Sequence, residues 1–169
     1  MKITEGMLRA ARLDVSLYEE VEADRSLTRQ ATAVVLLSAV AAGIGAAMHG
    51  PRIAVTVVAA VVLWYLWAFL TYLIGTRVLP EPQTKADFGQ LLRTIGFASS
   101  PGVIRILGII PGLVRPAFAV AHIWMLVAMV VAVHQALDYT SSWRAAGVVL
   151  VGWLIQALLL DALLRGAFF

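Results

Sequence analysis

The sequence predicts an all-α, polytopic membrane protein in which an amphipathic helix precedes a bundle of membrane-spanning helices. Of its 169 residues, 61% are hydrophobic and 14% are charged, and the mean hydropathy is +0.88. A soluble domain has about half apolar and a quarter charged residues, and a chain of this length cannot bury such an apolar excess in its own interior. These values disfavour a soluble enzyme, a nucleic-acid-binding domain and a disordered chain.

The charged residues divide the chain into an amino-terminal segment, 1–28, and a membrane domain, 29–169. Of the 23 charged residues, 11 lie within the first 29. Apolar side chains such as Met7 and Tyr18 recur here at helical spacing, while Arg9 and Glu20 fall on the opposite side. We therefore expect an amphipathic helix that either lies along the membrane surface or packs in solvent on the cytoplasmic loops.

Four weakly charged stretches of the membrane domain are long enough to cross a bilayer as helices, which takes about 20 residues each. They predict spans at about 30–49, 53–76, 116–137 and 144–165. The last stretch reaches spanning length only if its helix continues past Asp161.

The third hydrophobic region, 88–114, differs from the others because Arg105 lies inside it. Ser100 and Pro101 suit a helix cap and a first helical position, so we expect a break near 99–101. Pro111 then ends the second piece. Such a break is tolerated in lipid only where protein or a water-filled cavity covers the freed backbone groups.

The distribution of Lys and Arg predicts a cytoplasmic amino terminus, because positively charged loops stay in the cytoplasm. Five spans place nine of these residues inside and three outside, with Arg105 uncounted, whereas a re-entrant third region places ten inside and two outside. Both arrangements agree on the amino terminus and differ on the carboxyl terminus. The count does not choose between them.

Two stretches, 91–113 (LLRTIGFASSPGVIRILGIIPGL) and 123–153 (IWMLVAMVVAVHQALDYTSSWRAAGVVLVGW), resemble the bacterial branch of the Yip (Ypt-interacting protein) domain family. The shared features are an R-x-x-G-F-A-x-S-P stretch, a Pro-Gly turn, a Trp-led helix that ends in Q-A-L-D, and an R-A pair that opens the last helix. The residues in question are Arg93, Gly96, Phe97, Ala98, Ser100, Pro101, Pro111, Gly112, Trp124, Gln135, Ala136, Leu137, Asp138, Arg144 and Ala145.

The resemblance implies a multi-pass protein of the bacterial cytoplasmic membrane with five transmembrane helices and a cytoplasmic amino terminus; the third of these helices would be the one that contains the expected break. Eukaryotic members are associated with Rab-type GTPases and with the membranes of transport vesicles. No catalytic residue comes with the family.

Ionisable residues at membrane depth are candidates for function, because an unpaired charge there costs at least about 2.5 kcal/mol. We expect Arg105 to pair with Asp161, or otherwise to cap the carbonyl groups freed at Pro111, with a site for a lipid head group or small anion as the alternative. With five spans, Asp138 should pair with Arg93 or Arg144. A re-entrant third region would place Asp138 and Arg93 on opposite sides of the membrane.

Other patterns carry less specific expectations. Ala39, Gly43 and Ala47 form a small-residue face that suits close helix packing, within the chain or in a homo-oligomer. His134 and Asp138 share a helix face, but two ligands do not make a metal site. No cysteine is present, and no catalytic motif is recognisable. We therefore expect no enzyme activity, no cofactor and no metal.

The sequence favours a non-enzymatic membrane scaffold or adaptor. Its partners would be membrane lipids and a cytoplasmic protein, not nucleic acid. The contacts would be made by the 77–93 loop and by an acidic patch, Glu19, Glu20, Glu22 and Asp24. The alternative is a small transporter or channel component with a polar pathway around Ser100 and Arg105.

Overall fold

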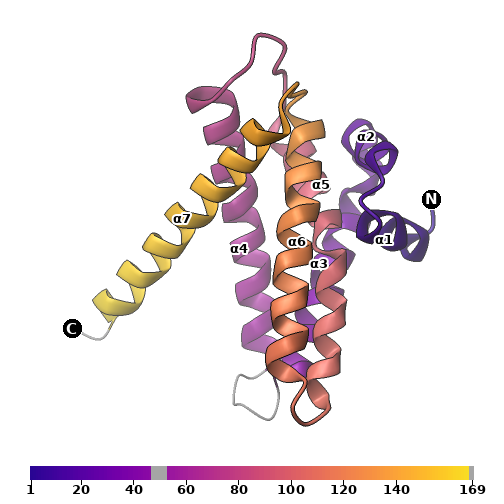
Figure 1. Cartoon of the computed structure of the whole chain (residues 1–169), viewed down its shortest axis with the longest axis vertical. Helices are drawn as coiled ribbons and strands as arrows, with labels where there is room; N and C mark the ends of the chain where they lie inside the picture. Colours follow the sequence, from indigo (N-terminus) through magenta and orange to yellow (C-terminus); the bar gives the residue numbers. More distant parts are fainter. Residues whose placement is uncertain (47–52, 168–169) are drawn as a thin grey trace.

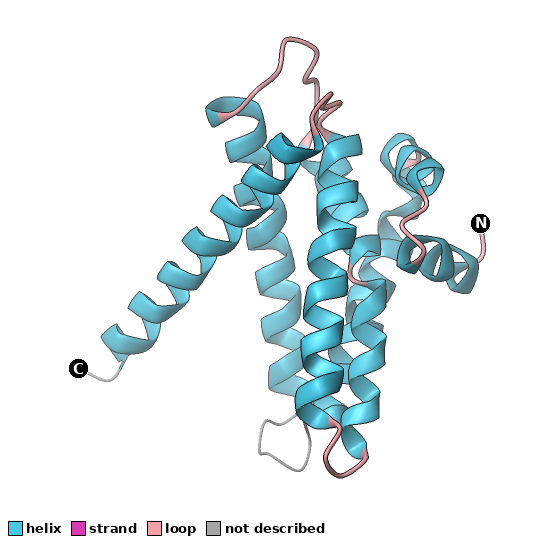
Figure 2. Cartoon of the chain, in the orientation of Figure 1, coloured by secondary structure: helices cyan, strands magenta, loops and turns pink. Residues whose placement is uncertain are grey.

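The computed structural model describes residues 1–46 and 53–167, with side chains for 1–46 and 54–158. This part of the chain forms helices and no strands (Figure 2). In chain order the elements are α1 (Ile3–Ala11), α2 (Val15–Ala23), the 3-10 turn η1 (Arg25–Leu27), α3 (Thr28–Gly45), α4 (Ile53–Leu73), the π-helical η3 (Ile74–Val78), α5 (Phe88–Ala98), the 3-10 helix η4 (Ser100–Ile109), α6 (Val114–Ala136) and α7 (Ser142–Ala167).

The long helices form one bundle, from which α7 diverges toward the carboxyl terminus (Figure 1). Within the described residues, three helical stretches are long and apolar enough to cross a membrane: Arg25–Gly45, Ala54–Val78 and Val114–Ala136. A shorter apolar helix covers Ser142–Leu158. The predicted all-α bundle of apolar helices is therefore present, with three candidate spans by length and composition.

The third hydrophobic region changes from α-helix to 3-10 helix at Ser100, where the sequence predicts a break. Asp87 starts α5, because its carboxylate accepts a hydrogen bond from the backbone N–H of Gln90 at 2.8 Å. The eleven residues of α5 and the ten of η4 span together about 36 Å at their respective rises. They run from the end of the bundle where α4 ends to the end where α6 begins (Figure 1).

The long 3-10 segment η4 packs closely on α3 and α6. A Cβ on Gly102 would overlap the hydroxyl of Ser38, and a Cβ on Gly45 would overlap the carbonyl oxygen of Arg105. A Cβ on Gly108 would lie 2.6 Å from the carbonyl oxygen of Gly45. Glycine at these positions lets the α3 and η4 backbones approach each other, as small residues do between helices in lipid.

The amino-terminal segment is two short helices, not the single helix that its periodicity predicts. Leu13 has φ 60°, in the left-handed region, so the α-helix cannot continue through it. Asp14 then caps α2, because its carboxylate accepts a hydrogen bond from the N–H of Ser16 at 3.0 Å. Apolar residues recur at helical spacing on both sides of this turn, but their spacing does not predict the turn itself.

Candidate functional site

The unit formed by α1 and α2, the N-terminal unit, is held together by Arg9. Its guanidinium donates from Nε to Asp14 Oδ2 at 2.7 Å and from Nη2 and Nη1 to the two carboxylate oxygens of Glu20 at 2.8 and 2.9 Å. Nη2 also donates to the hydroxyl of Ser16 at 3.0 Å. Bidentate pairing of this kind fixes both partners more firmly than a single surface contact. The hydrogen bonds from Arg9 lower the pKa of Asp14 to about 2 and also lower the pKa of Glu20.

The N-terminal unit is docked on the membrane helices and is not a free tail. Leu17, Tyr18 and Val21 are fully buried where α2 packs on α5 and α6. From α5, the buried Arg93 donates to the carbonyl oxygens of Val21, at 2.9 Å, and Glu22. These carbonyls belong to the last turn of α2, whose oxygens have no partner within the helix. Arg93 therefore caps α2 and anchors it to the bundle.

Of the four acidic residues singled out by the sequence, Glu19, Glu20 and Asp24 are exposed and Glu22 is half-buried. Glu22 accepts a hydrogen bond from Gln90 of α5 at 3.2 Å. Burial, followed by the negative charge of Asp138, raises the pKa of Glu22 to about 7. We call Glu19, Glu20 and Asp24 the acidic face; all three are exposed on a unit that the bundle holds in place.

A second polar cluster joins the 79–87 loop to the α6–α7 turn. The buried carboxylate of Glu81 accepts hydrogen bonds from the N–H and hydroxyl of Thr140, both at 2.9 Å, and pairs with Arg144 Nε at 3.3 Å. The N–H of Thr140 is the main reason that the pKa of Glu81 lies below its usual value. Tyr139 donates to the carbonyl oxygens of Gly75 and Leu79 at 3.1 and 2.7 Å. Sequence reasoning missed this cluster.

The predicted ion pair of Asp138 with Arg93 or Arg144 is wrong. Within the described chain, Arg93 binds backbone carbonyls of α2 and Arg144 pairs with Glu81. Asp138 is exposed and has φ 51°; its carbonyl oxygen accepts a hydrogen bond from Gln83 Nε2 at 2.9 Å. It turns the chain after α6, which is a backbone role that its charge does not reveal.

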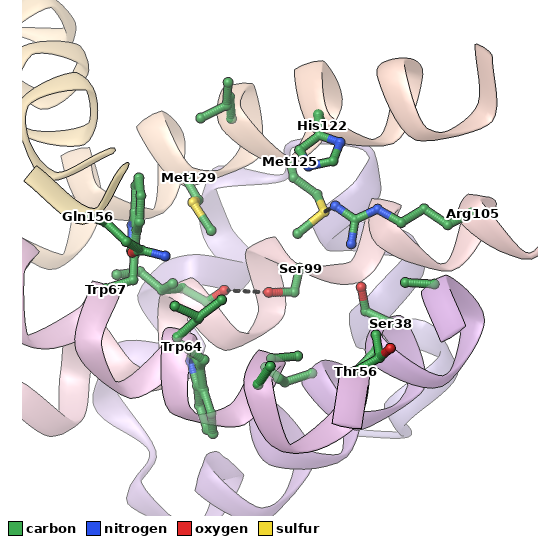
Figure 3. A pocket seen from close by; sticks show the side chains of 18 of the residues that line it. Ser38, Thr56, Trp64, Trp67, Ser99, Arg105, His122, Met125, Met129 and Gln156 are labelled. Atoms are coloured by element: carbon green, nitrogen blue, oxygen red, sulfur yellow. Dashed lines mark hydrogen bonds between the residues drawn. The ribbon is translucent and has the colours of Figure 1, made fainter. Parts of the chain in front are cut away.

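Arg105 lines a cavity of about 550 Å³ inside the bundle, between α3, α4, α6 and α7 (Figure 3). Its guanidinium lies 5.7 Å from the centre of the Phe118 ring, and its Nη2 lies 3.1 Å from the sulfur of Met125. Its Nε is buried and has no hydrogen-bond partner among the described residues. Carbonyl groups near Pro111 are not among the contacts recorded for this side chain, and the side chain of Asp161 lies outside the described residues.

The remaining predicted residues have structural positions. Ser100 is buried and donates its hydroxyl to the carbonyl oxygen of Phe97 at 2.6 Å, and Pro101 lies in the first turn of η4. Gln135 Oε1 lies 3.4 Å from His134 Nδ1. Neither Ser100 nor Gln135 reaches the cavity of Arg105.

The small-residue face of α3 is used within the chain. Ala39 is 3% exposed and Gly43 is buried, because α3 packs on η4, α4 and α5. Ala47 lies outside the described residues. Within the part of the chain with described side chains, three or more His, Cys, Asp or Glu residues are nowhere grouped so that they could hold a metal ion.

The comparison with family models decides the classification, because the model described as the Yip1 domain matches residues 16–163. The chain belongs to the Yip1 family. The match begins within α2 and ends within α7, so it covers the acidic face, the Arg93 cap, the Glu81 cluster and the Arg105 cavity of this Yip1-family chain. Neither the comparison with curated proteins nor that with solved structures found a significant match. Membership and the apolar helices identify a multi-pass integral membrane protein.

Proposed function

We propose that this Yip1-family protein is a non-enzymatic membrane scaffold whose N-terminal unit presents the acidic face to a cytoplasmic protein partner. The observation that carries the proposal is the anchoring of α2. Arg93 holds its last turn, and three fully buried side chains pack it on the bundle. A binding surface that is already ordered loses less conformational entropy when a partner binds.

The acidic face offers recognition by charge. Glu19 of α2 and Asp24, which follows α2, are exposed, so they can meet a basic partner surface. Complementary charges raise association rates and exclude partners of the wrong sign. Glu20 pairs with Arg9 and Asp24 accepts a hydrogen bond from the N–H of Ser26 at 2.8 Å, so both carboxylates are held in place beside the exposed Glu19.

The cytoplasmic orientation of this face rests on the charge distribution. The first 29 residues carry five Lys and Arg residues, which are retained on the inner side of a membrane. Five spans are supported by α5 and η4, whose combined length exceeds the hydrocarbon thickness of about 30 Å. The bacterial cytoplasmic membrane is the location that this arrangement fits.

Transport has less support. A polar pathway around Ser100 and Arg105 would need both side chains to line one water-filled channel. Ser100 is instead buried, and its hydroxyl donates to the carbonyl oxygen of Phe97. The cavity that contains Arg105 is walled mainly by alanine, valine, leucine, methionine and tryptophan side chains. Such walls suit an apolar occupant better than a column of water.

Site-specific photo-crosslinking in native membranes tests the scaffold role. A photoreactive residue in place of Glu19 should form a discrete protein adduct, whereas the same residue in place of the lipid-exposed Val58 of α4 should not. In the Glu19-labelled chain, Asp24→Lys should reduce the adduct several-fold, and Glu5→Lys, an exposed change on α1, should leave it intact. An adduct of equal yield in the Asp24→Lys protein would contradict recognition by the acidic face.

A further inference from the structure

The cavity of Arg105 contains polar atoms that the described chain leaves without partners. Arg105 Nε, Trp67 Nε1 and Gln156 Oε1 are buried, line the cavity and form no hydrogen bond. Trp67 is 6% exposed, so its N–H has no access to bulk solvent in compensation. A buried polar group without a partner costs about 1–3 kcal/mol. Of the three, only Arg105 is charged, so its missing partner is the costliest and points to an occupant that supplies it.

The partly buried cation requires the strongest compensation. The contacts that the structure records for the Arg105 guanidinium are a ring face and a thioether, and neither carries a negative charge. Among the described residues that line the cavity, none is acidic. Burying a charge is costly unless it is paired and hydrogen-bonded. Among the described side chains, an anionic group is the partner that this end of the cavity lacks.

The guanidinium also points inward. Arg105 is four residues from the end of η4, yet its Nη2 contacts Met125, eleven residues into α6, or about 16 Å along that helix. Figure 3 shows Arg105 directed toward Met125 and His122 at one end of the cavity, with Trp67 and Gln156 toward the other. A long basic side chain near a helix end more often snorkels outward to water.

The rest of the cavity is long and apolar. Its wall on α4 runs from Val55 to Trp67, which is about 18 Å at the rise of an α-helix. Its volume of about 550 Å³ lies in the range of small-molecule sites, about 300–1,000 Å³. Trp153 of α7 lines it and is 52% exposed, so the cavity reaches the surface at α7. A chain of methylene groups fits such a space.

We propose that this cavity binds an amphiphile with an anionic head group and an apolar chain. The head group lies against Arg105, and the chain extends between α4 and α6 toward Trp67 and Gln156. Two sources share this chemistry, a free fatty acid and an anionic phospholipid of the bilayer. The site is separate from the acidic face, so it stands or falls independently of the scaffold role.

Native mass spectrometry of the full chain in a neutral detergent tests the proposal. Palmitate, phosphatidylglycerol and phosphatidylcholine are added separately. One molecule of an anionic amphiphile should bind, and phosphatidylcholine should bind at least ten-fold more weakly. Binding of palmitate alone identifies a free fatty acid as the ligand, and binding of phosphatidylglycerol identifies a bilayer lipid. Equal affinity for all three, or no bound molecule, would overturn the proposal.

Variants separate the head-group contact from the fold. Arg105→Gln should weaken binding at least ten-fold, whereas Arg115→Gln, at an exposed arginine outside the cavity, should not change it. If Arg105→Gln fails to fold, the binding affinities of Arg105→Lys and Ala60→Phe test the site instead. The first retains the charge and should keep affinity within a few-fold; the second fills the cavity and should abolish binding. Retained binding in Ala60→Phe would show that the ligand lies elsewhere.

Discussion

Trp124 of α6 donates its indole N–H to the carbonyl oxygen of Ala11, the last residue of α1, at 2.8 Å. The two residues are 113 positions apart in the chain. Trp124 lies ten residues from the start of α6, or about 15 Å along it. The first helix of the protein is therefore tied to the middle of a candidate membrane span and not only to its end.

Trp124→Phe should loosen α1. An aromatic ring is retained but the indole N–H is lost, and a hydrogen bond of this kind contributes about 1 kcal/mol. We expect roughly a five-fold rise in hydrogen exchange for the amides of α1, which corresponds to that free energy. Trp143→Phe, at a side chain that is 88% exposed, is the matched control and should leave α1 unchanged. Equal exchange in both variants would mean that this hydrogen bond does not hold α1.

Docking of α2 should weaken as the pH rises from about 5 to 8. The pKa of Glu22 is raised from 4.5 to about 7 in the folded chain, first by burial and then by Asp138. The docked state therefore binds the proton more tightly; its stabilisation is full below 4.5 and is lost as the pH rises through 7. Because Glu22 is only half-buried, the effect should be about 1 kcal/mol or less.

The measurement is the melting temperature in detergent across this pH range. It should fall toward pH 8 in the wild type, and the fall should be smaller in Glu22→Gln. Glu19→Gln, at an exposed neighbour on the same helix, should behave as the wild type does. A Glu22→Gln profile as steep as that of the wild type would assign the pH dependence to another group.

Gly102→Ala should destabilise the bundle, because the added Cβ would overlap the hydroxyl of Ser38 on α3. Overpacking of this kind costs about 1–3 kcal/mol, and it should lower the melting temperature in detergent. Gly147→Ala in α7 is the control, since nothing lies within 4 Å of the added methyl group. That variant should be neutral or slightly stabilised, as alanine is the better helix former. Equal melting temperatures for the two variants would contradict the close approach of η4 to α3.

A cross-link between positions 83 and 138 tests whether the third region crosses the membrane. Gln83 precedes α5 and donates to the carbonyl oxygen of Asp138 after α6, so the two positions lie at the same end of the bundle. The chain contains no cysteine of its own, so cysteines placed at 83 and 138 form the only reactive pair. A short thiol cross-linker should join them in membranes. A re-entrant third region separates them by the bilayer and forbids the product.

Composition and the lengths of the apolar runs predicted the all-α membrane bundle, because the rise per residue of a helix and the thickness of a bilayer are both nearly constant. The change of helix type at Ser100 was also predictable, since proline and serine act locally there. The turn at Leu13 was not. A leucine in the left-handed region carries no sequence signal, and only the packing of both helices on the bundle compensates for it.

The charge partners were less predictable than the elements. Arg93 binds backbone carbonyls of α2. Every residue has a backbone carbonyl, so pairing opposite charges in the sequence cannot predict this contact. Arg144 was assigned to Asp138 by proximity in the chain, whereas its partner Glu81 lies 63 positions away on a loop whose path the sequence does not define. The inward direction of the Arg105 side chain depends on its rotamer and its neighbours. The sequence therefore predicted that Arg105 lies at membrane depth, but not the direction in which its side chain points.

Anchoring of the N-terminal unit on the bundle underlies the proposed function, and a cross-link between positions 22 and 90 measures it. Glu22 Oε1 and Gln90 Nε2 are 3.2 Å apart, but these atoms are the ends of two long side chains. Cysteines at the two positions are therefore joined with a flexible bis-maleimide and not by a disulfide, which needs Cα atoms within about 7 Å. No other thiol competes, because the chain contains no cysteine of its own. In native membranes, most of the Glu22→Cys, Gln90→Cys protein should form the intramolecular cross-link. No cross-linked product, while each cysteine reacts freely with a monofunctional maleimide, would contradict a docked N-terminal unit.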